Sequence, residues 1–205
     1  MEAFRFAKSE VEFKKQFPND DRPDAINWSI AAVRMSEIAL RLGSARRETA
    51  AWNAVSKKRV LDLGCGSSER IDGFIYGPYL ARLLSAQGAI VFGIDLGKPF
   101  PEDAEIYTHI KTDIIPLVMT KTLHALPQIS DMQFDIVDAD AFVGENPSPT
   151  LVSKLKSLGY TEREFSQLLL QQIAEMTTDG GIILFGEKHF KKSGNALIEF
   201  DSENN

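Results

Sequence analysis

A short acidic and glycine-rich stretch, Asp62-Leu63-Gly64-Cys65-Gly66, carries the strongest chemical signal in the chain. It closes the apolar run Arg59–Leu63, and a strand that ends in Gly-x-Gly lets a ligand approach the backbone where a Cβ atom would collide. Dinucleotide-binding enzymes use a related pattern, G-x-G-x-x-G, whose third glycine lies where helix meets strand. That third position is Glu69 here, so the dinucleotide pattern fails. The acidic Asp62, two residues before the first glycine, indicates a ligand turn of another kind.

This stretch resembles the first motif of class I S-adenosylmethionine-dependent methyltransferases, D-x-G-x-G-x-G. Asp62, Gly64 and Gly66 match that motif, and Ser68 replaces its last glycine. The resemblance implies a Rossmann-like methyltransferase fold and a turn that cradles the amino-acid end of the cofactor, whose ammonium favours nearby carboxylates and carbonyls. Cys65 lies inside this turn, where its small size explains it better than nucleophilicity does. The structural alternative is a glycine turn of the kind found in any α/β protein.

Two later segments match the same family. Asp95, followed by Leu96, closes the second expected strand, and in the family such an acid accepts both ribose hydroxyls, a bidentate role that suits a carboxylate. The segment Thr112-Asp113-Ile114 follows the third expected strand, and Asp113 matches the family residue that bonds the adenine amino group. The resemblance therefore implies cofactor contacts from both segments. Each acid also has a structural alternative, Asp95 as a loop cap and Asp113 as the N-cap of the next helix.

Asp138 and Asp140 follow the fourth expected strand, where the resemblance places the methyl acceptor. We predict that both are catalytic and that Asp138 also borders the cofactor. Methyl transfer from a sulfonium is an in-line displacement, which needs a near-attack geometry and, for some acceptors, removal of a proton. The same residues resemble the exit of strand four in cation-dependent O-methyltransferases, where one Asp binds Mg²⁺. The lysine that follows there is Ala141 here, and the second metal-ligand pair after strand five is not evident. Glu187 and His189 occupy that region, where a carboxylate–histidine set could hold a metal or act as a base, but solvated loop charges are favoured and no metal is predicted.

Strands and helices alternate from residue 57 onward. The expected strands, most of them nearly continuously apolar, are Arg59–Leu63, Ala89–Ile94, Glu105–Ile110, Phe134–Val137 and Ile182–Phe185. The expected helices run from Asp24 to about Leu42, over Pro78–Ala86 and Ile114–Ala125, and from the capping box Thr161-Glu162-Arg163-Glu164 to a stop at Asp179-Gly180-Gly181. This order predicts an α/β fold with a mostly parallel twisted sheet and helices on both faces. Ligands bind such sheets beyond the carboxyl ends of the strands, where the strand order reverses.

The stretch from Gly66 to Asp95 is longer than the compact family pattern, and the extra residues fall near Ser68–Gly77. This segment lies beside the expected cofactor and carries Phe74 and Tyr76, with Tyr79 just beyond. We propose a lid or a wall of the substrate site for this segment. A loop that packs its aromatic side chains on the core explains it equally well.

The chain nearly ends after the fifth expected strand. The family fold adds a strand–helix–strand unit there, whereas only residues 188–205 remain, with Asn195–Phe200 as one expected strand. The C-terminal end of the fold is therefore expected to be abbreviated. The edge or face of the fifth strand then needs a cover, either from Ala196–Phe200, from the N-terminal segment or from a partner subunit, so a homodimer is among the expectations.

Length and charge bound the remaining alternatives. The 205 residues suit an N-terminal helical segment, residues 1–56, that packs on a cofactor-binding domain, residues 57–205. The net charge of −6, without a dense Lys/Arg block, makes nucleic acid an unlikely partner. The one cysteine excludes an intrachain disulfide, the N-terminus lacks the apolar segment of a signal peptide, and no apolar run approaches the roughly 20 residues that span a bilayer. We therefore expect a cytoplasmic protein with no membrane partner.

These observations favour an S-adenosylmethionine-dependent methyltransferase that releases S-adenosylhomocysteine. Its acceptor is not indicated by any motif, and a small molecule is favoured. One alternative is a catalytically inactive protein of the same fold that binds the cofactor as a binding or scaffolding module. A second is another nucleotide-using enzyme such as a reductase, against which the missing third glycine counts.

Overall fold

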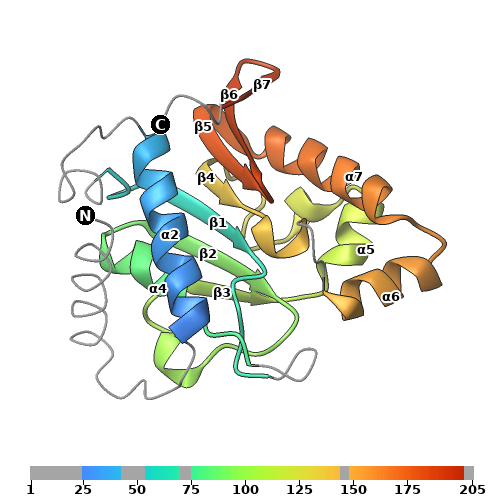
Figure 1. The fold of residues 1–205 in the computed structure, drawn as a ribbon, viewed down its shortest axis with the longest axis horizontal. Helices are drawn as coiled ribbons and strands as arrows, with labels where there is room; N and C mark the ends of the chain where they lie inside the picture. Colours follow the sequence, from blue (N-terminus) through green and yellow to red (C-terminus); the bar gives the residue numbers. More distant parts are fainter. Residues whose placement is uncertain (1–24, 43–53, 70–74, 144–147, 201–205) are drawn as a thin grey trace.

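The core of the molecule is a seven-stranded sheet in the order β3-β2-β1-β4-β5-β6-β7 (Figure 1). The computed structural model describes residues 25–42, 54–69, 75–143 and 148–200. The strands are β1 (Arg59–Leu63), β2 (Ile90–Asp95), β3 (Thr108–Lys111), β4 (Phe134–Asp138), β5 (Thr177–Phe185), β6 (Lys188–Ser193) and β7 (Ala196–Glu199). The first five are parallel, and β6 and β7 extend the sheet as antiparallel neighbours. The predicted α/β class with a mostly parallel sheet is confirmed.

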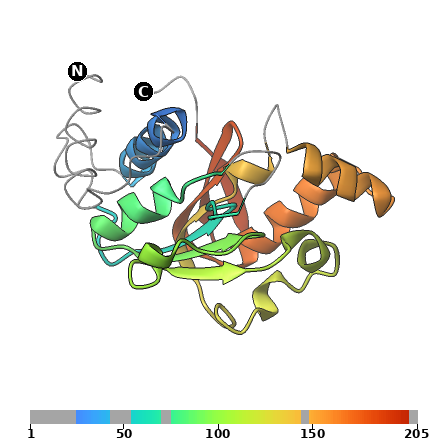
Figure 2. The same ribbon diagram turned by 90° about the horizontal axis from the view of Figure 1, so that it is seen from below.

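Helices cover both faces of this sheet, as Figure 2 shows. One face carries α2 (Ala25–Arg41) and α4 (Tyr79–Ala86), and the other carries α5 (Ile114–Met119), α6 (Pro149–Ser157) and α7 (Glu162–Glu175). Three short 3₁₀ helices lie in the connections, η1 (Pro101–Asp103), η2 (Leu123–Ala125) and η3 (Asp140–Phe142). None of the helices in the described ranges is long and apolar enough to cross a membrane.

Alternation along the strands divides the core into two layers. In β1, Leu61 and Leu63 join the cluster beneath α5 and α7, whereas Val60 joins the cluster beneath α2 and α4. Because successive strand residues point to opposite faces, Asp62 lies on the same face as Val60. The α2 and α4 face is therefore the one on which Asp62 is buried.

Three strands and the start of α7 agree closely with the prediction from the sequence. The bounds of β1 are those predicted, β2 and β4 differ from prediction by one residue, and the capping box of Thr161 and Glu164 is present at the start of α7. The third strand was expected from Glu105 but begins at Thr108, because the amides of Ile106 and Tyr107 bond the carbonyl of Asp103 in a turn. The predicted helix Ile114–Ala125 ends at Met119, and Lys121 adopts a left-handed φ of 57° before η2 begins.

The predicted helix stop at Asp179-Gly180-Gly181 is wrong. Helix α7 ends at Glu175, and the three residues belong to β5, which starts at Thr177. Pairing of β5 with β4 shifts register between Phe134 and Ile136, and Gly180 takes a φ of 78° within this irregularity. A glycine-rich stretch therefore serves a bulge rather than a helix end.

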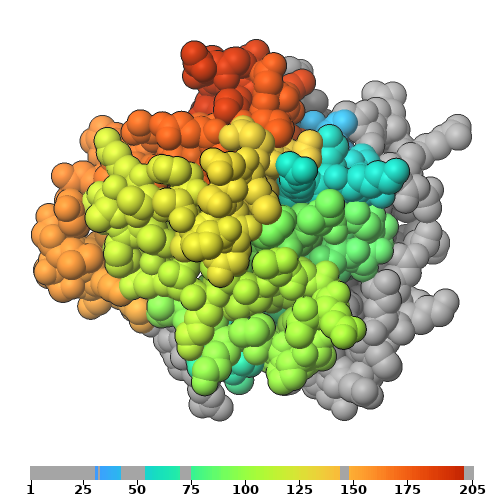
Figure 3. Space-filling view, turned by 180° about the vertical axis from the view of Figure 1, so that it is seen from behind, coloured from blue at the N-terminus to red at the C-terminus, as the bar shows by residue number. Residues whose placement is uncertain are grey.

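The edge of β5 is covered by β6 and not by residues 196–200. The chain turns directly after β5, so that Ile183 pairs with Phe190, and β7 then pairs with β6. These C-terminal strands, red in the space-filling view of Figure 3, stand at one end of the molecule. The helix predicted from Asp24 to about Leu42 corresponds to α2, and Asp24 itself lies outside the described ranges. The division of the chain at residue 56 stays a prediction.

Candidate functional site

Three aspartates stand at the carboxyl ends of adjacent parallel strands. Asp62 is on β1, Asp95 ends β2 and Asp138 ends β4, and their exposed fractions are 5%, 7% and 4%. All three occupy strand positions that alternate with the core on the α5 and α7 face, so they lie on the α2 and α4 face. The connections after β1 and β4 run to opposite faces, which makes this the reversal point where α/β sheets bind ligands.

Asp62 is the group in this cluster whose bonding is incomplete. Its Oδ2 atom is fully buried and has no hydrogen-bond partner within the described part of the chain. Burial raises the pKa of this carboxyl well above its usual range, and the nearby Asp138 and Asp95 raise it further. A buried carboxylate oxygen of this kind lowers the stability of the folded state unless a hydrogen-bond donor reaches it.

Asp95 joins the glycine turn to the loop after β2. Its Oδ2 accepts from the Gly66 amide at 3.1 Å, and its Oδ1 accepts from the Gly97 amide at 2.9 Å. The loop-cap interpretation of this aspartate is therefore realised. Each carboxylate oxygen keeps a second lone pair, so the same group can also accept hydroxyl donors. Leu96, which follows it, is exposed.

The two motif glycines are required by the protein's own packing. Gly64 and Gly66 have left-handed φ values of 78° and 98°. A Cβ atom on Gly64 would lie 2.5 Å from the Cβ atom of Ala141, and one on Gly66 would lie 2.5 Å from the carbonyl oxygen of Tyr76. The sequence analysis explained the glycines by the close approach of a ligand. In the structure, Gly64 faces η3 and Gly66 faces the backbone at Tyr76.

Cys65 is a structural thiol. It is buried against Gly93, where an added Cβ atom would lie 2.6 Å from its Sγ atom. Burial is the largest cause that raises the pKa of the thiol well above its usual range, so the nucleophilic thiolate is disfavoured. Its Sγ lies 3.8 Å from Nδ1 of His109, whose Nε2 lies 3.0 Å from the Gly97 carbonyl oxygen. His109, to which the sequence assigned no role, thus supports the loop after β2.

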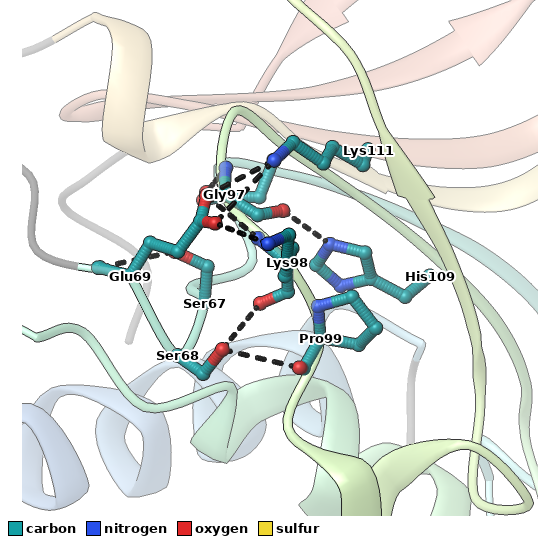
Figure 4. A network of polar contacts seen from close by, with 9 residues as sticks. Ser67, Ser68, Glu69, Gly97, Lys98, Pro99, His109 and Lys111 are labelled. Carbon is teal, nitrogen blue, oxygen red and sulfur yellow. Dashed lines mark hydrogen bonds and ion pairs between the residues drawn. The ribbon is translucent and has the colours of Figure 1, made fainter.

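Ser67–Glu69, the residues after the glycine turn, contact the loop that follows β2, as Figure 4 shows. The Ser68 amide donates to the Lys98 carbonyl at 2.9 Å, and its hydroxyl lies 3.1 Å from the carbonyl oxygens of Lys98 and Pro99. The Glu69 carboxylate accepts from the Lys98 amide at 3.2 Å and pairs with Nζ of Lys111 at 3.1 Å. Ser68 and Glu69, where nucleotide motifs carry glycine, therefore use their side chains to hold two strand exits together.

The structure describes only part of the predicted lid segment Ser68–Gly77. Phe74 lies outside the described residues, and Tyr76 is exposed. Tyr79, the first residue of α4, is buried in the core of the protein. The packing interpretation therefore holds for Tyr79. A lid or substrate wall remains a proposal for the rest of the segment.

Asp113 caps α5, which was the alternative to adenine recognition. It accepts from the Ile115 amide at 3.1 Å, and its other oxygen forms an ion pair with Lys154 of α6. Lys154 was not identified from the sequence, because its partner is 41 residues away. The Thr112 amide donates to the Asp95 carbonyl at 2.9 Å, and the Ile114 side chain is buried in the core.

Asp138 and Asp140 are joined to each other and to α2. The Asp140 amide donates to Oδ1 of Asp138 at 2.9 Å, and the Asp140 carboxylate forms an ion pair with Arg34. Burial raises the pKa of Asp138 to about 6, while the Asp140 amide and Arg34 act in the opposite direction. Arg34 also lies 3.1 Å from Nε2 of His189. Within the described ranges, no group of three or more His, Cys, Asp or Glu side chains is arranged to hold a metal ion.

Comparisons with known proteins give a distant similarity in fold. No protein-family model matches the chain, and no curated protein matches it. Among solved structures it is similar to the MycE methyltransferase from the mycinamycin biosynthetic pathway in complex with Mg, SAH and mycinamycin VI, with 14% identity and a TM-score of 0.42 over 73% of this chain and 36% of that one. A second crystal form with Mg and SAH gives 13% identity and a TM-score of 0.43 over 80% and 43%. The chain thus spans less than half the length of these proteins, and at these values the similarity assigns neither a substrate nor a site.

Proposed function

We propose that the chain binds S-adenosylmethionine at the carboxyl ends of β1, β2 and β4 and takes part in methyl transfer to an acceptor, with a small molecule favoured. The observation that carries the proposal is the buried Oδ2 atom of Asp62, which lacks a donor among the described residues at the reversal point of a parallel sheet. A ligand that places an N–H group there would complete the bonding of this carboxylate.

Charge favours a cationic group at this position. Asp62 is influenced by two further buried carboxyls, Asp138 and Asp95, and both raise its pKa. Arg34 is the cation that acts on Asp138 among the described residues, and it also pairs with Asp140 and Glu37. Acidic groups therefore outnumber the cations, and the ammonium of the cofactor's amino-acid end would offset the excess.

The residues proposed to bind the nucleoside end of the cofactor already make hydrogen bonds within the protein. Asp95 keeps one lone pair on each oxygen for ribose hydroxyls, beside its bonds to Gly66 and Gly97. Asp113 is engaged with Ile115 and Lys154. We therefore assign the amino-acid end to Asp62, the ribose to Asp95, and leave adenine recognition by Asp113 as the weaker part of the proposal.

When bound, S-adenosylmethionine supplies an activated methyl group on a sulfonium centre. The chain's own part is to hold that end against Asp62, to keep water from it through the buried strand ends, and to offer Asp138 as a proton acceptor. With a pKa of about 6, Asp138 is mostly ionised at neutral pH and can accept a proton from an acceptor hydroxyl or ammonium. Its partner Asp140 is the more accessible carboxylate of the two.

Calorimetric titration with S-adenosylhomocysteine tests the cofactor proposal. We expect micromolar binding to the native chain and a loss of about tenfold or more in Asp62→Asn, because a charge-assisted bond is removed. Asp135→Asn is the control, since Asp135 is an aspartate of the neighbouring strand β4 that bonds Lys58 and the Arg59 amide instead. Failure of the native chain to bind S-adenosylhomocysteine, or clear binding of NAD in its place, would refute the proposal.

The second candidate, a cofactor-binding module without turnover, is favoured by one observation. The Asp140 carboxylate, predicted to be catalytic, already forms an ion pair with Arg34. Both candidates bind S-adenosylhomocysteine, and only the enzyme converts S-adenosylmethionine to it in the presence of an acceptor. Production of S-adenosylhomocysteine with a panel of small hydroxyl and amine compounds therefore separates them.

A further inference from the structure

We propose that Arg34 is a positioning residue of this site, whose one guanidinium orients Asp140 after β4 and His189 on β6 and provides the cation that faces Asp138. The inference rests on the proposed function, because it concerns the acceptor side of the same site. It adds a residue from α2, a helix that no motif connects with the cofactor.

The first support is a row of residues across four strands. Asp62 is the register partner of Asp138, Asp138 is that of Leu184 on β5, and Leu184 is that of His189 on β6. Leu184 belongs to the core beneath α2 and α4, so the whole row points to that face. Partners in register across a sheet point to the same side. His189 therefore lies on the α2 face at the level of the two aspartates.

Arg34 reaches this row from above. Its Nη1 donates to Oε2 of Glu37 at 2.8 Å and lies 3.1 Å from Nε2 of His189. Its Nη2 pairs with the Asp140 carboxylate and lies 3.5 Å from the carbonyl oxygen of Gly186, in the turn between β5 and β6. The side chain is only 16% exposed. One side chain of α2 thus contacts the exits of both β4 and β5.

These contacts define the state of His189. A guanidinium has only donors, so Nε2 of His189 must accept and the ring proton of the neutral form is on Nδ1. Burial is the main cause that lowers the pKa of His189, and Arg34 and Arg41 of α2 lower it further. Glu37 and Asp140 act in the opposite direction. Arg34 thereby favours a neutral imidazole with a defined tautomer.

The same cation acts on Asp138. Burial raises the pKa of Asp138 to about 6, and Asp140 and Glu37 add to that effect. The Asp140 amide and Arg34 oppose it. Asp62 on β1 is the further buried carboxyl beside Asp138, and Asp138 raises its pKa. Without Arg34 the pKa of Asp138 would rise, so that less of the carboxylate would be ionised at neutral pH.

A purely structural role makes a different prediction. A guanidinium that only holds α2 to the sheet would lower stability when removed and would leave the titration of His189 and Asp138 unchanged. Titration midpoints therefore separate a positioning residue from a packing contact. Two variants serve the test, Arg34→Met, which removes the charge, and Arg34→Lys, which retains it without the planar fork.

The first experiment follows the imidazole C2 proton of His189 by NMR from pH 5 to 8, assigned with His189→Gln, in the ligand-free native chain. Removal of a cation raises a histidine pKa, so Arg34→Met should raise the midpoint and Arg34→Lys should raise it less. Arg163→Met, an exposed arginine at the start of α7, is the control and should match the native chain. A midpoint in Arg34→Met equal to the native one would overturn the inference. If Arg34→Met does not fold, Arg34→Gln takes its place, because glutamine also removes the charge, and a midpoint equal to the native one would again overturn the inference.

The second experiment is the pH dependence of S-adenosylhomocysteine binding. Native affinity should fall as pH drops through about 6, where Asp138 is protonated. A midpoint raised by one unit in Arg34→Met would make binding about threefold weaker than native at pH 6.5, with little difference at pH 8.5. An equal loss at both pH values contradicts the inference. Absence of native binding at every pH refutes the proposed function, whereas the histidine titration still tests Arg34 by itself.

Discussion

Asp62 and Asp138 are register partners in the parallel pair β1 and β4, and their carboxyls are buried side by side on the face covered by α2 and α4. Two acids in this relationship oppose each other's ionisation, which is why Asp138 contributes to the raised pKa of Asp62. Such a pair lowers the stability of the folded chain. The consequences can be measured without knowing the acceptor.

Substitution of Asp62 should stabilise the chain while it weakens cofactor binding. Asp62→Asn removes a buried charge whose Oδ2 atom has no partner among the described residues, so we expect the free energy of unfolding at pH 8 to rise by about 1–3 kcal/mol. Urea unfolding at pH 8 measures it. Asp135→Asn, which loses bonds to Lys58 and the Arg59 amide, should instead leave stability equal or lower. A destabilised Asp62→Asn would indicate that the carboxylate is satisfied in the ligand-free chain.

Stability should fall as pH rises from about 4 to about 6. The pKa of Asp138 is about 6 in the folded chain and 3.8 in its unperturbed form, so the folded state binds more protons in this window. Unfolding free energy therefore decreases with pH there, by an amount on the order of 3 kcal/mol, and levels off above pH 6. Asp62, also raised, acts in the same direction.

Comparison with Asp138→Asn isolates this effect. The difference in melting temperature between Asp138→Asn and the native chain should grow from pH 4.5 to 6.5 in favour of the variant. The lowered pKa values of Glu69 and Glu164 cause the opposite trend below about pH 4.5, and they are common to both chains. A constant difference across the range would show that the Asp138 carboxyl titrates normally.

Gly66 should tolerate no side chain. Alanine there would require a φ near 98° and a Cβ atom 2.5 Å from the Tyr76 carbonyl oxygen, so we expect a loss of about 3 kcal/mol in unfolding free energy. Gly180→Ala is the matched control, because its φ is also positive at 78° but nothing lies within 4 Å of the added atom. That control should cost about 1 kcal/mol. Equal costs at both sites would mean that the chain at Tyr76 moves freely away.

A buried ion pair holds α4 to the exit of β2. Arg82 donates from Nε to Oδ1 of Asp103 at 2.6 Å and from Nη2 to Oδ2 at 3.0 Å, with both side chains fully buried. Arg82→Met should cost about 3–5 kcal/mol, because it leaves the Asp103 charge buried without this partner. The double variant Arg82→Met with Asp103→Leu should recover much of the loss. Guanidinium unfolding of the native chain, Arg82→Met, Asp103→Leu and the double variant measures it, and additive losses would contradict the pairing.

The sequence by itself determined the class of fold and the edge of the sheet that carries the candidate site. Mostly apolar runs that end near glycine or aspartate indicate β1, β2 and β4, because a strand covered on both faces has few polar positions until it leaves the core. The capping box of Thr161 and Glu164 determined the start of α7 by local bonds alone. Since parallel strands share one carboxyl edge, Asp62, Asp95 and Asp138 had to gather there.

Only the tertiary structure decided which neighbours these residues have. The contacts of Arg34 with Asp140 and His189, and of Glu69 with Lys111, join residues that are far apart in the chain, and no local pattern specifies such pairs. The stretch at Gly180 has the composition of a helix stop, yet pairing with β4 placed it in β5. Local propensity amounts to tenths of a kcal/mol per residue, whereas sheet pairing and burial contribute more, so tertiary contacts prevail where the two disagree.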